Sequence, residues 1–565
     1  MTTANAEKKT LLHCLLYWEK NTPSGVYLTQ PYGDGVVKNF TWQQVGDEVR
    51  RVATYIQGLN LPPKSNIALL GRNSAHWIMA DLAIWMAGHV TVPLYPTLNG
   101  ETAAYIFDHS EVKALIVGKM DGKGDGWNEI KDVIPATLPI IATPLSPAML
   151  SDKPQWTDIV AKTEPLKNPT MPELDDISTI VYTSGSTGQP KGVLHSFRTM
   201  IVITSGMEEI WGFSNQDRML SYLPLAHVAE RAAVETMSLY FGFHVFFSEG
   251  LETFQKDLQR AQPTIFFSVP RLWTKFFLGV SEKMPMKKQK LLFSLPILGK
   301  IVKKKILSQL GMDKVRTALT GSAPLPPHII EWYRNLGLEL LDVYGMSENF
   351  AYSHACKPNE VRVGYVGSVN PGVDHRIADN GEIQVKSPAQ MIGYFKMPDK
   401  MAEEMTDDGY FKTGDRGEID EKGRLRITGR VKELFKTSKG KYVAPAPIEN
   451  KLNNHPKIEV VCATGSGEPQ PFALLMLSLD AMKELQRGEL DKETLAAEFK
   501  ELLKSVNETL EDHERMDYVV VVKDQWTMEN GFLTPTMKIK RNIIEDRYLA
   551  NAEKWLGMKQ RVIWE

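Results

Sequence analysis

The stretch YTSGSTGQPKG, residues 182–192, packs glycines and hydroxyl side chains into one loop that ends close to Lys191. Apolar runs flank the loop at 177–181 and 193–194. Glycines free backbone N–H groups to point at one ligand, and hydroxyl groups add donors, so a loop of this kind is suited to holding phosphate. It is not a Walker A loop, because Lys191 is followed by Gly192 rather than by Ser or Thr. The sequence therefore favours a phosphate loop outside the ordinary P-loop NTPases, with a solvated Gly/Ser/Thr linker as the alternative.

Outward from this loop, strand-like and helix-like segments alternate. NIALLG (66–71) is followed by a helical run (75–89) and by VTVPLY (90–95). Strand-like runs return at TIFFSV (264–269) and LELLDVYG (338–345). Short apolar strands that alternate with helices predict an α/β architecture with largely parallel sheets.

The pattern changes from about residue 382, where EIQVKSP and GEIDEKGRLRITGR predict short antiparallel strands joined by glycine turns. A chain of 565 residues is too long for one core. We expect a large N-terminal domain of several sheets, residues 1–431, and a small mobile α+β domain, residues 432–565. The elements expected in the small domain are a helix at 447–455, strands at 458–464 and 471–477, a helix at 492–510 and a strand at 518–522.

Composition restricts the partners and the compartment. With 66 basic and 68 acidic residues the net charge is −2, which gives no overall attraction for nucleic acid. Three separated cysteines form neither a metal-ligand spacing nor a disulfide framework, which favours the cytoplasm. No run of about 18 uncharged apolar residues predicts a membrane span. LLHCLLYW (11–18), closed by Glu19 and Lys20, predicts an amphipathic surface helix rather than a signal peptide.

Residues 284–312 hold seven lysines and no acidic residue. If this segment is helical, Val302, Ile306 and Leu310 form an apolar stripe with Lys300 and Lys304 roughly opposite. One interpretation is a solvated basic surface hairpin. The other is a patch that rests on anionic lipid at the inner membrane surface, where each lysine contributes roughly 1 kcal/mol.

The opening stretch resembles the signature of the adenylate-forming superfamily, which includes acyl-CoA synthetases, luciferases and peptide-synthetase adenylation domains. Further stretches resemble that family's motifs in the expected order, and the similarity spans about residues 40–545. These stretches are YGMSE (344–348), KTGDRGEID (412–420), GRVKELFKTSKGKYVAP (429–445) and PTMKIKR (535–541). The resemblance implies an acyl-CoA synthetase-like fold, with ATP, Mg²⁺ and coenzyme A as the cofactors.

The resemblance also implies roles for single residues. Thr183 and Glu348 would hold Mg²⁺, Asp415 would accept hydrogen bonds from the ribose hydroxyls with Arg430 beside it, and Tyr344 would stack on the adenine. The nucleotide would lie among Thr183, Ser184, Gly185, Ser186, Thr187, Gly188, Lys191, Gly321, Ser322, Ala323, Tyr344, Gly345, Met346, Ser347, Asp415, Arg430 and Lys436.

The catalytic residues implied by the resemblance are Lys538, Glu348 and His227. The Lys538 ammonium would bridge the incoming carboxylate and the α-phosphate. The family usually has glycine before this lysine, and Met537 stands there, so Lys540 is a competing assignment. His227 would lie beside the acyl carbonyl, and Lys432 would be the hinge about which the small domain turns.

The same resemblance bears on the substrate. Amino-acid-activating relatives place an aspartate in the segment that corresponds to residues 223–247, and none occurs there. An ammonium buried without a partner would be costly, so amino acids are disfavoured. PLYPTLN (93–99), LPLAHVAER (223–231) and KTSKGKYVAPAPIEN (436–450) most resemble long-chain fatty acyl-CoA synthetases.

We therefore expect a medium- to long-chain fatty acid to be converted to acyl-AMP and then to acyl-CoA, with release of AMP and pyrophosphate. An aryl- or short-chain acid ligase and an acyl-AMP ligase that feeds a carrier protein are the alternatives on the same fold. A catalytically inactive lipid-surface binding protein is the alternative from a different class.

Overall fold

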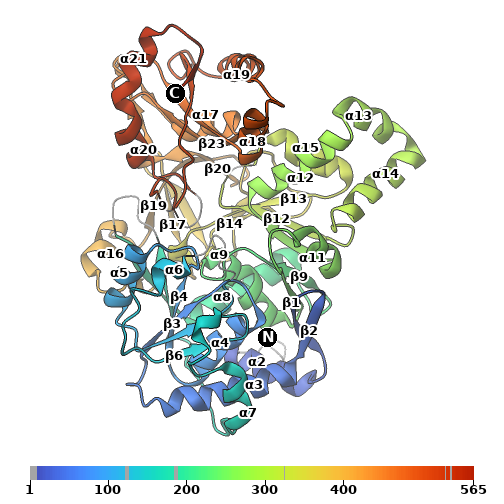
Figure 1. Cartoon of the computed structure of the whole chain (residues 1–565), viewed down its shortest axis with the longest axis vertical. Helices are drawn as coiled ribbons and strands as arrows, with labels where there is room; N and C mark the ends of the chain where they lie inside the picture. The colour runs from blue at the N-terminus through green and yellow to red at the C-terminus, as the bar shows by residue number, and fades with distance from the viewer. Residues whose placement is uncertain (1–8, 121–125, 184–188, 324, 529, 535–537) are drawn as a thin grey trace.

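The computed structural model describes residues 9–120, 126–183, 189–323, 325–528, 530–534 and 538–565. In Figure 1 the blue, green and yellow segments form a large lower body, and the orange and red segments form a smaller lobe above it. The predicted α/β class, with a large N-terminal part and a smaller C-terminal part, is confirmed. The boundary between residues 431 and 432 stays a prediction; the short 3₁₀ turn Val431–Glu433 lies there.

One sheet carries the ends of the opening stretch. Its order is β18-β8-β7-β4-β3-β5-β6. Every neighbouring pair from β7 to β6 is parallel, whereas the pairs β7–β8 and β8–β18 are antiparallel. Its parallel strands are apolar at nearly every position because helices cover both faces. The strands are β18 (Gly393–Tyr394), β8 (Lys191–Ser196), β7 (Ile177–Thr183), β4 (Val90–Leu94), β3 (Asn66–Leu70), β5 (Ala114–Val117) and β6 (Ile140–Ala142).

Two further sheets complete the α/β body. One has the order β2-β1-β10-β9 and the other the order β11-β12-β13-β14-β15, with β9, β10, β11, β12 and β13 in parallel pairings. Their strands are β1 (Val26–Gly33), β2 (Val36–Thr41), β9 (Arg218–Ser221), β10 (His244–Phe247), β11 (Ile265–Ser268), β12 (Thr317–Gly321), β13 (Leu340–Tyr344), β14 (His354–Ala355) and β15 (Ser368–Val369).

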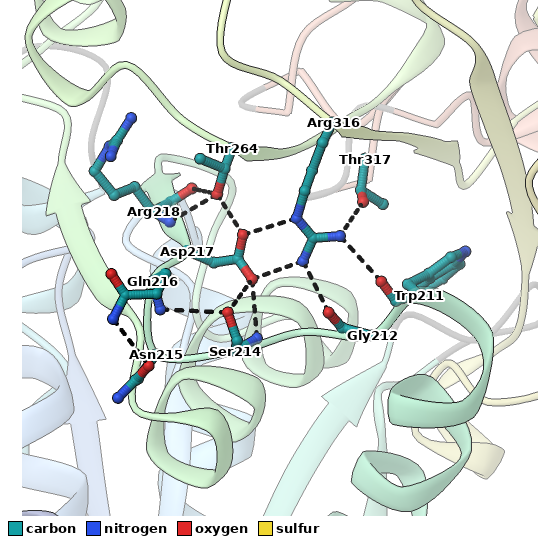
Figure 2. A network of polar contacts seen from close by, with 10 residues as sticks. All are labelled: Trp211, Gly212, Ser214, Asn215, Gln216, Asp217, Arg218, Thr264, Arg316 and Thr317. Carbon is teal, nitrogen blue, oxygen red and sulfur yellow. Dashed lines mark hydrogen bonds and ion pairs between the residues drawn. The ribbon is translucent and has the colours of Figure 1, made fainter.

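A buried carboxylate joins these two sheets at the beginnings of their strands. Asp217, which is 4% exposed, accepts two hydrogen bonds from Arg316 (3.0 and 2.6 Å) and one from the Thr264 hydroxyl (2.7 Å). Figure 2 shows Arg316 also donating to the carbonyl oxygens of Trp211 and Gly212, where a helix ends. The residues just before β9, β11 and β12 are therefore held by one network, at the edge opposite the strand ends discussed below.

The helices pack between and around the sheets. Helix α4 is buried at every position, as expected of a helix that is apolar all round. In chain order the helices of the body are α2 (Leu11–Asn21), α3 (Trp42–Gly58), α4 (Ala75–Met86), α5 (Gly100–Ser110), α6 (Trp127–Ile130), α7 (Trp156–Lys162), α8 (Phe197–Trp211), α9 (Val228–Glu230), α10 (Met237–Phe241), α11 (Phe254–Ala261), α12 (Pro270–Lys283), α13 (Met286–Ser294), α14 (Pro296–Gln309), α15 (Pro327–Leu336) and α16 (Pro398–Glu404).

The prediction of a surface helix at residues 11–18 was wrong in one respect. The segment is helical, as α2, but Leu11, Leu12 and Leu15 are fully buried and Trp18 donates to the carbonyl of Leu239 at 2.8 Å. Apolar residues at 11, 12, 15 and 18 make a stripe wide enough for both α3 and α10 to pack on it. Helix α2 is therefore part of the main core.

From β16 to β20 the strand pairings are antiparallel, as predicted, whereas in the lobe that follows β25 pairs in parallel with both β24 and β26. One sheet has the order β16-β17-β19-β20, formed by β16 (Asp374–Ile377), β17 (Glu382–Lys386), β19 (Phe411–Ile419) and β20 (Leu425–Arg430). In the upper lobe, the predicted strand at 458–464 is observed with those bounds, and the helix predicted from 447 begins two residues earlier, with a proline in its first turn. The lobe consists of β21 (Phe435–Lys436), β22 (Tyr442–Val443), α17 (Pro445–Leu452), β23 (Ile458–Thr464), β24 (Phe472–Leu477), α18 (Leu479–Arg487), α19 (Lys492–Asn507), β25 (Val519–Val521), α20 (Arg541–Tyr548), α21 (Ala552–Gly557) and β26 (Val562–Trp564).

Within the residues that the structure describes, no helix combines the length and the apolar character that a membrane crossing requires.

Candidate functional site

The opening stretch is the connection between two antiparallel strands. Thr183 ends β7 and pairs directly with Lys191, the first residue of β8. The five predicted phosphate ligands between them lie outside the described residues: Ser184, Gly185, Ser186, Thr187 and Gly188. What the structure shows is therefore the base of a hairpin loop, with a hydroxyl on one side and an ammonium on the other.

Lys191 points toward acidic and aromatic groups from other parts of the chain. Its Nζ lies 3.9 Å from the Glu404 carboxylate and 4.6 Å from the centre of the Tyr394 ring. Burial lowers the pKa of Lys191, while Glu348 and Glu404 oppose that shift. The ammonium is thus a half-buried cation in reach of a second anion.

Glu348 meets the same tyrosine. It lies in the 3₁₀ turn Ser347–Asn349 directly after β13, and its Oε1 accepts a hydrogen bond from the Tyr394 hydroxyl at 2.8 Å. Among the described residues no group of three or more histidine, cysteine, aspartate or glutamate side chains is arranged to hold a metal ion. A single carboxylate close to a phosphate loop does suit Mg²⁺, which takes one or two protein carboxylates and completes its shell with phosphate oxygens and water. Glu348 therefore fits such a cation only together with a phosphate ligand.

The two strands β19 and β20 place an acid and a base side by side. Asp415 and Arg430 are partners in the strand register, and Arg430 Nε lies 3.1 Å from Asp415 Oδ1. The Tyr344 hydroxyl, from the end of β13, donates to Asp415 Oδ2 at 2.7 Å. Burial, together with the Asp415 charge, raises the pKa of Tyr344 well above its usual value. A carboxylate has further acceptor sites, so Asp415 is still able to accept from a pair of hydroxyl groups.

Close backbone approaches shape the surface next to Tyr344. A Cβ on Gly345 would lie 2.4 Å from the carbonyl carbon of Ala351, and one on Gly321 would lie 2.7 Å from Val343 Cγ2. No larger side chain fits at either position without displacing its neighbours. The residues that follow, Ser322 and Ala323, are exposed and open to a ligand, and Ser322 has a positive φ of 70°. Beside them, Met346 and Ser347 form the turn that presents Glu348.

The upper lobe contributes Lys538. Its main chain is held in a tight loop, where Thr534 N donates to the Lys538 carbonyl at 2.8 Å and Lys538 N donates to the Thr534 hydroxyl at 3.1 Å. The side chain keeps access to water, yet the surrounding protein and Arg430 lower the pKa of Lys538, against the raising effect of Asp415 and Glu433. Lys538 therefore lies close to the Asp415–Arg430 pair.

His227 lies near the same ammonium. Burial, with a smaller effect of Lys538, lowers the pKa of His227 to about 4, so its imidazole is neutral at physiological pH. Its Nδ1 accepts from the backbone N–H of Ala229 at 3.1 Å, which leaves Nε2 free to carry the proton. An ion pair between Arg271 of α12 and Glu459 of β23 joins the body to the lobe in this arrangement.

The predicted hinge and one predicted nucleotide ligand are exposed. Lys432 lies in the turn between β20 and β21. Lys436 stacks over the Tyr442 ring at 5.4 Å. Within the described residues, no hydrogen bond or ion pair joins Lys436 to Asp415 or Glu348.

Two acidic residues near the site had no predicted role. Glu230 is fully buried and accepts from the Ser221 hydroxyl and Tyr222 N at 2.9 Å each and from the Asn73 amide at 3.2 Å. Burial raises the pKa of Glu230 to about 8. The short helix α9 that begins after His227 is thereby attached to β9. The sequence LPLAHVAER could have indicated this residue, because the charged Glu230 and Arg231 follow an apolar run.

The second acidic residue without a predicted role is Asp342, two residues before Tyr344 on β13. It pairs in register with Thr320, next to Gly321, and burial raises its pKa to about 8. Its carboxyl group therefore borders the surface that the glycines leave open. Tyr394 is a third residue that the sequence did not indicate, because it comes from β18, more than 150 residues after Lys191.

Comparisons with known proteins identify the family of the chain. Residues 18–395 match the family model described as AMP-binding enzyme, and residues 433–555 match AMP-binding enzyme C-terminal domain. Long-chain-fatty-acid--CoA ligase FadD15 of Mycobacterium bovis is 27% identical over 95% of both chains. Long chain acyl-CoA synthetase 6, peroxisomal, of Arabidopsis thaliana is 29% identical over 93% of this chain and 83% of its own length.

Among solved structures, the adenylation domain of a carboxylate reductase from Mycobacterium chelonae superimposes with a TM-score of 0.81. It covers 98% of this chain and 92% of that one at 19% identity, and this likeness concerns the fold alone.

Proposed function

The chain belongs to the AMP-binding enzymes, and on that premise we propose that it is an AMP-forming ligase that joins a medium- to long-chain fatty acid to coenzyme A. One observation carries the proposal. Groups from both parts of the chain, far apart in sequence, are linked to one another by hydrogen bonds, an ion pair and mutual electrostatic effects: Lys191, Glu348, Tyr344, Asp415, Arg430, His227 and Lys538.

In the first half-reaction an oxygen of the fatty-acid carboxylate attacks the α-phosphorus of ATP, and the bond from that phosphorus to the bridging oxygen of the β-phosphate breaks. Acyl-AMP forms and pyrophosphate leaves with the bonding electron pair. Both reactants are anions, so the site must supply positive charge in advance. Lys191 and the loop after Thr183 hold the β- and γ-phosphates, and Lys538 draws the carboxylate to the α-phosphate.

The nucleoside is held by the strand ends. Asp415 accepts from the ribose hydroxyls and keeps its orientation through Arg430 and Tyr344. The adenine lies against the open surface after Gly321, with Asp342 at its border. Thr183 and Glu348 would hold Mg²⁺, which would supply positive charge against the negative charge of the triphosphate. Tyr394 orients the Glu348 carboxylate for that role.

In the second half-reaction the thiol of coenzyme A attacks the acyl carbonyl, the thiol proton is lost, and AMP leaves. The carbonyl oxygen gains negative charge during that attack, and the N–H that a neutral His227 carries on Nε2 is able to donate a hydrogen bond to it. Lys538 is no longer required at that stage, and rotation about Lys432 removes it. Lys538, rather than Lys540, is assigned to adenylation because its charge acts on His227 and lies near Asp415.

The structure adds support for a fatty acid over an amino acid. The acidic residues within 223–247 are Glu230 and Glu235, and both are fully buried. Glu230 is bonded to Ser221, Tyr222 and Asn73, and Glu235 accepts from Arg231 Nε at 3.0 Å. Neither carboxyl group is available for the ammonium of an amino acid, so an uncharged substrate tail is favoured.

The test is a panel of acids supplied with ATP, Mg²⁺ and coenzyme A, with AMP release and thioester formation measured together. Saturated acids of medium to long chain should give the highest kcat/KM. A preference for acetate or benzoate would replace the fatty acid with a short-chain or aryl acid. ATP-dependent transfer to a carrier protein but not to coenzyme A would refute the ligase assignment.

A further inference from the structure

A basic helical hairpin projects from the body on the side of α12 and α15. Helices α13 and α14 are antiparallel neighbours joined at Leu295, and Figure 1 shows them extending outward at the right of the molecule. The predicted stripe packs inward, since Ile306 and Leu310 are buried in the cluster around Trp332. The hairpin is thus attached at its base, and its far end has no covering element among the described residues.

The far end is unusually apolar for a surface. Six of the sixteen exposed large apolar side chains in the described residues lie between 286 and 301. Ile297 is 78% exposed, Leu291 is 66% exposed and Ile301 is 59% exposed. Scattered exposed apolar residues are common, but a contiguous group of them marks an interaction site. The members of the group that lie nearest the Leu295 turn, called the hairpin tip below, are Leu291, Leu295, Ile297, Leu298 and Ile301.

Four of the lysines form a second zone behind the hairpin tip. On α14 the exposed Lys304 and Lys305 follow Ile301 by one turn on the same face, which places them about 6 Å further along the helix axis. On α13 Lys287 and Lys288 precede Leu291 by one turn in the same way. Both helices therefore present apolar side chains at the tip and ammonium groups one turn back.

A basic hollow lies at the same depth. A cavity of about 330 Å³ is lined by Lys300, Lys303 and Lys304, together with Asn335 and the end of α15. Lys303 is held by Asn335 at 2.8 Å, and the one acid in the lining, Asp313, has Lys314 at 3.6 Å. The hollow therefore offers ammonium groups to an anion of the size of a phosphate headgroup.

We propose that the hairpin docks the enzyme on an anionic lipid bilayer, with the hairpin tip among the acyl chains and the lysines on the headgroup phosphates. Lysine stems lie along apolar surface while their ammonium groups reach the headgroups, which suits the observed order of the two zones. The phosphates of a nucleic acid would bind the lysines but would not bury the exposed isoleucines. This inference concerns where the enzyme works and does not depend on which acid it activates.

The experiment is co-sedimentation of the full chain with vesicles of phosphatidylcholine, with and without about one third phosphatidylglycerol. Ile297→Ser/Ile301→Ser should weaken binding to the anionic vesicles about 10-fold. Lys304→Gln/Lys305→Gln should weaken it about 30-fold, and added salt should reduce that difference. The matched controls are Leu251→Ser/Leu479→Ser and Lys500→Gln/Lys504→Gln, which alter exposed residues elsewhere and should bind like the unmodified protein.

All four variants should keep the unmodified kcat on a water-soluble acid, since none touches the site. Binding of the Ile297→Ser/Ile301→Ser variant that equals the unmodified protein would overturn the proposal. The proposal would also be overturned if the unmodified protein bound vesicles with and without phosphatidylglycerol equally well. A single-stranded DNA oligomer serves as a competitor. If it displaces the protein fully from the vesicles and binds the Ile297→Ser/Ile301→Ser variant as tightly as the unmodified protein, the surface is a polyanion site instead.

Discussion

The Asp217–Arg316 pair allows a quantitative prediction about stability. Asp217→Asn keeps the shape of the side chain but removes the charge that accepts from Arg316 at 3.0 and 2.6 Å and from Thr264 at 2.7 Å. Removing one member of a fully buried pair costs about 3–5 kcal/mol. The Arg316 side chain is 41% exposed and regains water, so we expect a smaller loss, about 2–3 kcal/mol in the free energy of unfolding.

The chain offers a matched control. Asp175 forms the same two-point pair with Arg198, at 2.6 and 2.8 Å, on the open surface. Asp175→Asn should therefore leave the free energy of unfolding nearly unchanged. The assay is equilibrium urea unfolding followed by tryptophan fluorescence. A loss for Asp217→Asn no larger than that for Asp175→Asn would show that the network does not hold the sheets together.

The same pair has a pH dependence of known sign. Burial would raise the pKa of Asp217, but Arg316 and Thr264 outweigh burial and hold it below its usual 3.8. A carboxyl with a lowered folded-state pKa contributes stability above its unfolded pKa and loses that contribution as the pH falls through the folded value. The difference between unmodified protein and Asp217→Asn should be constant near pH 7 and shrink only below about pH 4.

Three further changes separate the roles of other groups. Lys538→Ala should abolish acid-dependent adenylation yet leave thioester formation from supplied acyl-AMP largely intact, and an equal loss of both steps would refute its assignment. Glu459→Gln removes the ion pair with Arg271 that joins lobe to body, so adenylation should slow severalfold at low salt, with thioester formation unchanged and the effect absent at high salt. Burial raises the pKa of Glu230 to about 8, so the free energy of unfolding should fall as the pH rises from about 4.5 to 8. In urea unfolding Glu230→Gln should remove this pH dependence. Parallel pH profiles of the variant and the unmodified protein would contradict the prediction.

Much of the architecture was predictable because it depends on local patterns. The apolar strands β3, β4 and β13 and the antiparallel β19 and β20 follow from period and turn residues. Helix α2 was placed on the surface wrongly, because its partner α10 is remote in sequence and its apolar stripe alone does not show that a second helix covers it.

The residues of the candidate site also fall into two groups, those expected from sequence motifs and those that only the structure indicates. Glu348, Asp415 and Lys538 belong to contiguous motifs and were expected from them. Tyr394 and Asp342 were missed, since the first meets Glu348 only after β18 pairs with β8, and the second is one polar residue within an apolar strand. Lys436 was expected at the nucleotide, but its ring contact with Tyr442 is on an exposed hairpin. Contacts that arise from sheet order are not contained in the motifs themselves.

The central claim is that the carboxylate of a fatty acid takes AMP from ATP at this site. It is tested most directly with a long-chain fatty acid labelled with ¹⁸O in its carboxyl group, turned over with ATP, Mg²⁺ and coenzyme A, and followed by mass spectrometry of the products. Attack on the α-phosphorus leaves one labelled oxygen in AMP and none in pyrophosphate. Label in inorganic phosphate with ADP as the nucleotide product, or unlabelled AMP, would contradict the account.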